Sequence, residues 1–125
     1  MSKKNPDKRA KELINSMDDE FKKRKITIAV GNTKKNISLV GTSDKYMPKD
    51  ILAAMTENEI VATPNDGKHA EEDIVIEAEK RDLTVTEIGA SRPICLDCEK
   101  LLKAKNIKAK TEFSGKKSKK RRTKQ

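Results

Sequence analysis

Apolar residues near the N-terminus recur every three or four positions, which is the period of an amphipathic helix. The residues are Ala10, Leu13, Ile14, Met17 and Phe21. Asn5 and Pro6 precede them, and these residue types favour the cap and the first turn of a helix. We therefore predict one amphipathic helix within residues 1–25 that packs on the rest of the domain.

Two short runs of β-branched residues follow, and glycine bounds each of them. Ile26–Val30 precedes the turn-like pair Gly31-Asn32, and Asn36–Val40 alternates apolar and polar residues before Gly41. Such runs are typical of strands, and their spacing predicts a hairpin with a loop of about five residues. Beyond the hairpin the pattern is less regular, apart from a short helix that we expect within Pro48–Met55.

The second half of the chain alternates between helical and extended patterns. Helical spacing covers His69–Asp82 and Ile94–Lys105, whereas Leu83–Ile88 and Ile107–Phe113 have the composition of strands. A strand–helix–strand–helix–strand series favours a sheet with parallel strands and helices packed over it. We therefore predict a single α/β domain, a three-layer α/β/α sandwich whose mixed sheet has four or five strands.

Charge is placed unevenly along the 125 residues, which carry a formal net charge of +9. Residues 1–25 hold nine basic and five acidic residues, and residues 114–125 hold seven basic residues and no acid. Residues 26–113, which we expect to form the core, hold 13 basic and 15 acidic residues. The predicted tail, 114–125, has the low complexity of a disordered segment. A nucleic-acid partner contacted through the basic ends fits this distribution, and a solvated tail that serves solubility is the alternative.

Two broad classes of protein are disfavoured. No run approaches the roughly 18 apolar residues of a membrane helix, so we expect no membrane partner. The N-terminal residues lack the apolar segment of a secretory signal peptide. Two cysteines separated by two residues close almost no loop, so they do not staple a secreted scaffold. We expect the protein to act in a reducing compartment, the cytoplasm.

The only histidine and the only two cysteines fall in two short motifs. His69 stands two residues before Glu71, and Cys95 and Cys98 lie at the start of the next predicted helix. One imidazole and two thiols supply three zinc ligands and leave the fourth tetrahedral position open, as in catalytic zinc sites. We expect the helix start to lower the pKa of both thiols. Glu71 remains as a candidate proton carrier.

These motifs carry a resemblance to a known family. His69-Ala70-Glu71, followed by Pro93-Ile94-Cys95-Leu96-Asp97-Cys98, resembles the H-x-E … P-C-x-x-C zinc signature of the cytidine deaminase superfamily. The sequence of Ser91–Cys98 and the small size of the chain look most like those of the deaminase domains of bacterial polymorphic toxins. The resemblance covers residues 26–113. One departure is Ile94, which stands between the proline and the first cysteine where many relatives have Pro-Cys.

The resemblance implies a cytidine-deaminase-like fold and a zinc-dependent hydrolysis of cytosine to uracil in DNA or RNA. It places Zn²⁺ on His69, Cys95 and Cys98, with Glu71 as the catalytic proton shuttle. For a toxin domain it also implies an immunity protein as partner, and delivery by a larger protein or secretion system into the cytoplasm of a target cell. Many relatives have a fifth strand and a further helix, which we do not expect here.

Four substrate contacts are implied by the same resemblance. The backbone N–H of Ala70 would bind the carbonyl oxygen of the base, and the carbonyl near Ser91 would receive the departing amine. Arg92 lies in the same loop. Tyr46 is the aromatic on which a flipped base could stack, although a half-buried anchoring role is the commoner fate of such a residue.

Several alternatives stay open from the sequence. A Cys-x-x-Cys motif at a helix start also occurs in thiol–disulfide chemistry, and Asp97 could complete a structural zinc site. Within the deaminase interpretation, the substrate could be a free nucleoside or nucleotide, or adenine in RNA. A non-catalytic, zinc-stabilised nucleic-acid-binding module is a further reading, although such a module has no use for Glu71.

Overall fold

The computed structural model describes residues 5–117, and its five strands form one sheet in the order β3-β2-β1-β4-β5. The strands are β1 (Ile28–Thr33), β2 (Ser38–Thr42), β3 (Glu59–Val61), β4 (Val85–Ala90) and β5 (Lys108–Ala109). The helices are α1 (Pro6–Asn15), α2 (Glu20–Lys25), α3 (Lys49–Ala54), α4 (Ala70–Lys80) and α5 (Leu96–Ala104). No helix within residues 5–117 is both long and apolar enough to cross a bilayer.

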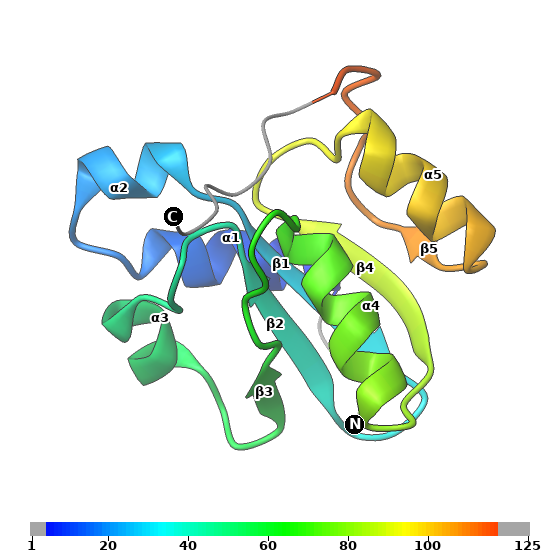
Figure 1. Cartoon of the computed structure of the whole chain (residues 1–125). Coiled ribbons are helices and arrows are strands. Elements are labelled where there is room, and N and C mark those ends of the chain that lie inside the picture. The colour runs from blue at the N-terminus through cyan, green and yellow to red at the C-terminus, as the bar shows by residue number, and fades with distance from the viewer. Residues whose placement is uncertain (1–4, 118–125) are drawn as a thin grey trace.

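Helices cover both faces of the sheet (Figure 1). Helix α1 packs on β1 and β4 and touches α3, whereas α4 lies across β2, β1 and β4 on the opposite face and α5 packs beside it over β5. The predicted three-layer α/β/α sandwich with a mixed sheet is therefore confirmed.

Strand β1 is the one strand of the sheet that runs against its neighbours. It pairs antiparallel with β2 and with β4, whereas β2–β3 and β4–β5 are parallel pairs. Strands β2 and β4 consequently point the same way, and their carboxyl ends meet at one edge of the sheet. The segments that lead into α4 and α5 begin at this edge, which is where open α/β sheets bind ligands.

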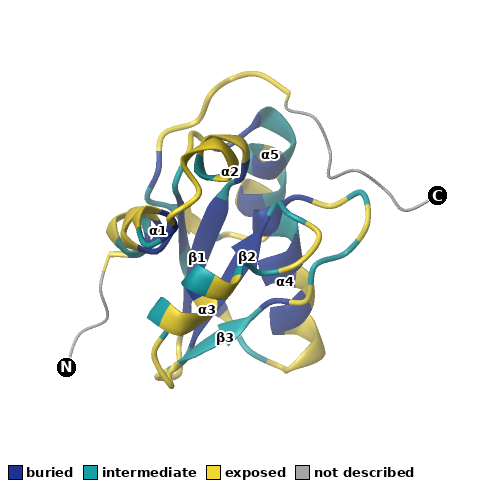
Figure 2. Ribbon diagram, turned by 90° about the vertical axis from the view of Figure 1, so that its left-hand side faces the viewer, coloured by how far each residue is buried: buried dark blue, intermediate teal, exposed yellow. Residues whose placement is uncertain are grey.

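Two separate apolar cores flank the sheet, whose central strands are almost wholly buried (Figure 2). Leu13, Ile28 and Val40 belong to the core under α1 and α3. Leu39 and Ile74 belong to the core under α4 and α5. Successive strand residues point to opposite faces of the sheet, so Leu39 and Val40 belong to different cores.

The N-terminal segment is not the single helix that we predicted. Helix α1 ends at Asn15, and α2 starts at Glu20 after a cap by Asp19, whose carboxylate accepts a hydrogen bond from the Lys22 backbone N–H at 3.0 Å. Leu13 is fully buried as expected, but Phe21, the last member of the apolar stripe, is 70% exposed. The N-cap at Asp19 therefore starts a second helix and interrupts the apolar period that we expected to continue to Phe21.

The glycines of the hairpin lie inside the strands rather than in turns. Strand β1 continues through Gly31 to Thr33, and β2 includes Gly41. A Cβ on Gly41 would collide with the backbone carbonyl of Ala70. The glycine therefore lets the first turn of α4 approach β2 more closely than any side chain would allow.

The edges of the sheet also differ from expectation. Strand β3 was not predicted, since three residues are too few to show a period. Only Lys108–Ala109 of the predicted last strand pairs as β5, although Phe113 forms an isolated parallel bridge with Ile94. Residues 118–125 of the predicted disordered tail lie outside the described residues.

Candidate metal centre

The three predicted metal ligands come together at the starts of two neighbouring helices. His69 is the N-cap of α4, Cys95 is the N-cap of α5, and Cys98 is in the first turn of α5. One nitrogen of His69 and the two sulfurs all lie within 4.8 Å of one another. Within residues 5–117 no other group of histidine, cysteine and acidic side chains meets the same condition.

The distances between these atoms fit a tetrahedral metal ion. His69 Nδ1 lies 3.2 Å from the Cys95 sulfur and 3.4 Å from the Cys98 sulfur. With metal–sulfur bonds of about 2.3 Å and a metal–nitrogen bond of about 2.0 Å, a tetrahedral angle separates N and S by about 3.5 Å. The residues therefore present a three-coordinate site that an ion could enter with little rearrangement.

The low solvent exposure of the three side chains also supports a metal site. His69, Cys95 and Cys98 are 7%, 5% and 0% exposed. The second imidazole nitrogen, Nε2, is buried and has no hydrogen-bond partner among the described residues. Its other nitrogen, Nδ1, contacts the two thiols, which are weak hydrogen-bonding groups. An ion bridging Nδ1 and both sulfurs would replace these weak contacts by strong ones.

The position of His69 is fixed by acidic residues of α4. The carboxylate of Glu72 accepts a hydrogen bond from the His69 backbone N–H at 2.8 Å. Asp73 is fully buried, and its Oδ1 accepts from the backbone and side-chain amides of Asn65 at 3.1 and 3.0 Å. The loop that leads into His69 is therefore anchored on the same helix that His69 caps.

The position of Cys95 is fixed by the C-terminal segment, which we define as residues 112–117. The Ile94 N–H donates to the Glu112 carbonyl at 2.9 Å, and the Ser114 N–H donates to the Ile94 carbonyl at 2.8 Å. The Leu96 N–H donates to the Lys116 carbonyl at 2.9 Å. Both neighbours of Cys95 are therefore hydrogen-bonded to this segment.

Glu71 is buried close to the metal ligands and opens on the same cavity. Burial, with smaller contributions from the charges of Glu72 and Asp73, raises the pKa of its carboxyl to about 7. A carboxyl with such a pKa can both accept and release a proton at neutral pH.

The pKa of the Cys98 thiol differs from the expectation for a helix start. Burial, followed by the negative charge of Glu71, raises this pKa above its usual range. Removing a fully buried sulfur from water outweighs the favourable field of the helix terminus. A metal ion would reverse this balance by supplying the positive charge that the thiolate lacks.

A cavity of about 490 Å³ opens over the metal centre. His69, Glu71 and Cys95 line its interior. Five basic residues also line it: Lys25, Lys68, Arg92, Lys116 and Lys117. Within residues 5–117 none of these five side chains forms a salt bridge with a carboxylate. The mouth of the cavity therefore carries unneutralised positive charge.

The predicted substrate contacts are placed unequally. Ala70, the first residue of α4, and Arg92 both line the cavity. Ser91 does not; its hydroxyl accepts a hydrogen bond from the Ile28 backbone N–H at 3.0 Å, at the end of the β1–β4 pair. Tyr46 is 69% exposed, so it is not a half-buried anchor, and it does not line the cavity.

Other residues of the cavity were not anticipated from the sequence. Thr27, Ser43 and Ser114 add hydroxyl groups to the lining, and Lys25 and Lys116 add charge. They come from segments far apart in the chain, so no local motif marks them. The net positive charge of the two ends was the one sequence signal that pointed to Lys25 and Lys116.

Comparison of the chain with protein-family models, with curated proteins and with solved structures finds no significant match. The assignment of a candidate metal site therefore rests on the positions of His69, Cys95 and Cys98.

Proposed function

We propose that this protein is a zinc-dependent hydrolytic deaminase that converts cytosine to uracil in single-stranded or locally unpaired nucleic acid. The observation that carries the proposal is the buried Glu71, which opens on the same basic cavity as a His-Cys-Cys metal group. The resemblance of the two motifs to the cytidine deaminase superfamily points the same way. A toxin-type effector role, with an immunity protein as partner, is part of the proposal and rests on that resemblance alone.

Zinc is the metal that suits these ligands. One imidazole and two thiolates in tetrahedral array are typical of zinc, and thiolates disfavour magnesium and calcium. Asp97 is not part of the ligand group, so the three residues leave one position open. A bound zinc ion with an open position supplies a water molecule acidified to a pKa of about 7.

Glu71 supplies the proton transfers. In hydrolytic deamination the C–NH2 bond of the base breaks, a C=O bond replaces it, and ammonia leaves. The carboxylate of Glu71 takes a proton from the attacking water and delivers it to the amine that departs. Its burial beside the ligands keeps this carboxyl away from bulk solvent, and the backbone N–H of Ala70 at the same helix start is available to the carbonyl oxygen of the base.

Nucleic acid is the substrate that the charge of the cavity favours. Five unneutralised basic residues around one mouth attract phosphates without sequence preference. A base within a duplex cannot reach a buried metal centre, so the target base has to be unpaired or flipped out. A free nucleotide is the second candidate, because a cavity of about 490 Å³ is large enough for one.

The test is to incubate zinc-loaded protein with single-stranded DNA, duplex DNA and RNA and to sequence the products. We expect C-to-T changes with the wild type, and a loss of at least about 100-fold with Glu71→Gln, since general acid–base catalysis contributes roughly 10²–10⁴-fold. Glu79→Gln is the matched control, because Glu79 lies on the same helix but 62% of its side chain is exposed and it pairs with Lys105. A-to-G changes instead would identify adenine as the target.

Two results would overturn the proposal. One is unchanged activity in Glu71→Gln. The other is an absence of base changes in any nucleic acid from protein that carries one zinc ion per chain, and deamination of a free nucleotide by that same protein would establish the second candidate.

A further inference from the structure

Helix α2 adds no residue to either apolar core. None of its six residues is buried, whereas α1, α3, α4 and α5 each bury at least one. Figure 2 shows α2 as mostly exposed ribbon. A helix this short is not stable by propensity alone, and neither core explains why the chain forms it. The role of α2 therefore lies at the protein surface.

The composition of α2 is that of a nucleic-acid contact. Four consecutive basic residues, Lys22–Lys25, follow Phe21. The ammonium group of Lys25 lies 4.2 Å from the centroid of the Phe21 ring, and 70% of Phe21 remains exposed. Exposing a phenylalanine forgoes the stabilisation that burial of its ring would contribute. An exposed ring beside cations is the arrangement with which proteins bind single strands, by base stacking and phosphate contact.

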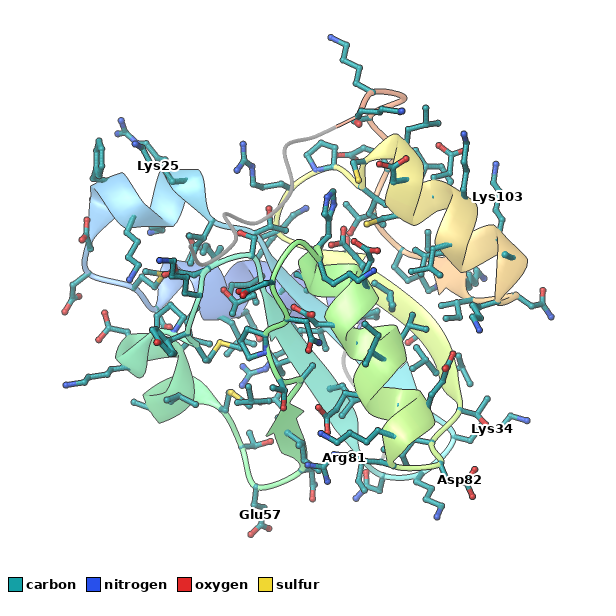
Figure 3. All side chains as sticks on the ribbon, in the orientation of Figure 1. Lys25, Lys34, Glu57, Arg81, Asp82 and Lys103 are labelled. Carbon is teal, nitrogen blue, oxygen red and sulfur yellow. The ribbon has the colours of Figure 1, made fainter. Side chains whose placement is uncertain are left out.

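Helix α2 is also continuous with the cavity. Lys25 ends the helix and lines the cavity mouth, one helical turn from Phe21. The guanidinium of Arg92 donates to the Lys25 carbonyl at 3.3 Å, which ties the helix to the loop before Cys95. On the other side, Lys22 pairs with Asp44 at 2.9 Å. Figure 1 shows α2 at the end of the molecule where α4 and α5 begin, and Figure 3 labels Lys25 in the same orientation.

The opposite part of the mouth is equally basic. Lys116 and Lys117 of the C-terminal segment line the cavity from the side of α5, where the backbone of Lys116 is held by Leu96. The mouth therefore has cations contributed by two separate parts of the chain. A chain of phosphates longer than one nucleotide could contact both.

We propose that α2 binds the nucleotide next to the target base: Phe21 stacks on the neighbouring base, and Lys25 contacts the phosphate between the two nucleotides. This inference rests on the proposed function and specifies its substrate as a single-stranded polynucleotide of several nucleotides. The requirement for an unpaired neighbour follows from stacking, because a base in a duplex has no free face.

The test measures binding of the zinc-loaded full chain to a fluorescent single-stranded oligonucleotide by anisotropy, with DNA and RNA in separate arms. Phe21→Ala is expected to weaken binding by about 5- to 150-fold, since stacking contributes about 1–3 kcal/mol per base, and Phe21→Tyr is expected to restore it. Leu52→Ala is the matched control, because Leu52 is also an exposed apolar residue (48%) but lies on α3 and does not line the cavity.

Salt dependence and substrate length provide independent measurements. Lys25→Ala is expected to lower the slope of log affinity against log salt by about 0.7, the value for one phosphate contact to a single strand. Lys49→Ala on α3 is its control. Cytidine monophosphate is expected to bind wild type and Phe21→Ala equally, because a mononucleotide has no neighbouring base.

The outcomes separate this inference from the proposed function. Deamination of the oligonucleotide with wild-type affinity in Phe21→Ala would leave the proposed function standing and overturn the role of α2. Equal affinity for duplex and single strand would overturn it as well. Affinity that depends on Phe21, from protein that deaminates nothing, would support the binding site and overturn the deaminase.

Discussion

Cys98 shows most clearly why the metal group needs an ion. Its sulfur is fully buried, lies 3.4 Å from His69 Nδ1 and is close enough to Glu71 for that carboxylate to raise its pKa. Without an ion, the site gathers three acidic groups, two thiols and a carboxyl, all on buried residues. A divalent cation is the partner that makes all three stable as anions.

The variant Cys98→Ser is therefore expected to lose the metal and the stability that the metal confers. In the wild type, zinc at 100 times its dissociation constant would raise the free energy of unfolding by about 2.7 kcal/mol. Thermal unfolding with and without zinc measures this gain, and elemental analysis measures the metal content. A serine variant whose unfolding temperature still rises with zinc would contradict the assignment of Cys98.

At the scale of single residues, the sequence predicted the candidate metal ligands because histidine and cysteine are rare in it. With one histidine and two cysteines, the chain offered a single combination of soft ligands, and the structure brings that combination together. The sequence could not reveal that the Ser91 hydroxyl accepts a hydrogen bond from the Ile28 backbone N–H. The helical spacing places Cys98 on the inner face of α5, but the sequence could not reveal that removing its sulfur from water raises the pKa of the thiol instead of lowering it.

Among the elements, the C-terminal segment is the one whose role the sequence most obscured. Its basic composition predicted a tail from residue 114, yet Ser114 and Lys116 are hydrogen-bonded to the residues on either side of Cys95. Backbone pairing does not depend on side-chain type, so composition cannot predict it. Strand β3 was missed for a different reason, because three residues are too few to show a period, and the break between α1 and α2 follows from the side-chain cap of Asp19.

Two truncations test whether this segment supports the metal centre. A chain ending at Phe113 removes the partners of the Ile94 carbonyl and the Leu96 N–H, whereas a chain ending at Lys117 keeps them. Loss of groups that orient a ligand commonly lowers metal affinity about 10–100-fold. We expect a loss of about tenfold for the shorter chain only, measured by competition with a zinc chelator. Equal affinities of the two chains would contradict this role.

In the molecule as a whole, the two apolar cores differ in whether they include residues of the metal site. The core between the sheet and α4–α5 includes Ala70, Cys95 and Cys98, whereas the core under α1 and α3 includes no residue of the metal group. The alternation of side chains along the strands made this two-sided arrangement predictable. Which face would carry the site depended on the crossing of α4 over β2, and no local pattern encodes that crossing.

Substitutions in the two cores are therefore expected to differ in their effect on the site. Leu13→Ala, in the core under α1, should cost about 2–5 kcal/mol of unfolding free energy with zinc affinity unchanged. Ile74→Ala on α4 should cost a similar amount and also weaken zinc binding, because Ile74 packs beside the Gly41–Ala70 contact that sets the start of α4. Both residues are fully buried. Calorimetry and zinc titration of the two variants measure the difference, and equal zinc affinities would contradict it.

The partition made by the sheet has a consequence for how such a protein can change over generations. Heat tolerance can be adjusted by repacking under α1, in the core that holds none of the three candidate metal ligands, while the lining of the cavity mouth can change without loosening that packing. Changes at sites that share no partners add nearly independently. The two traits can then be inherited, selected and engineered separately, so a small domain of this design can vary its cavity without losing its fold.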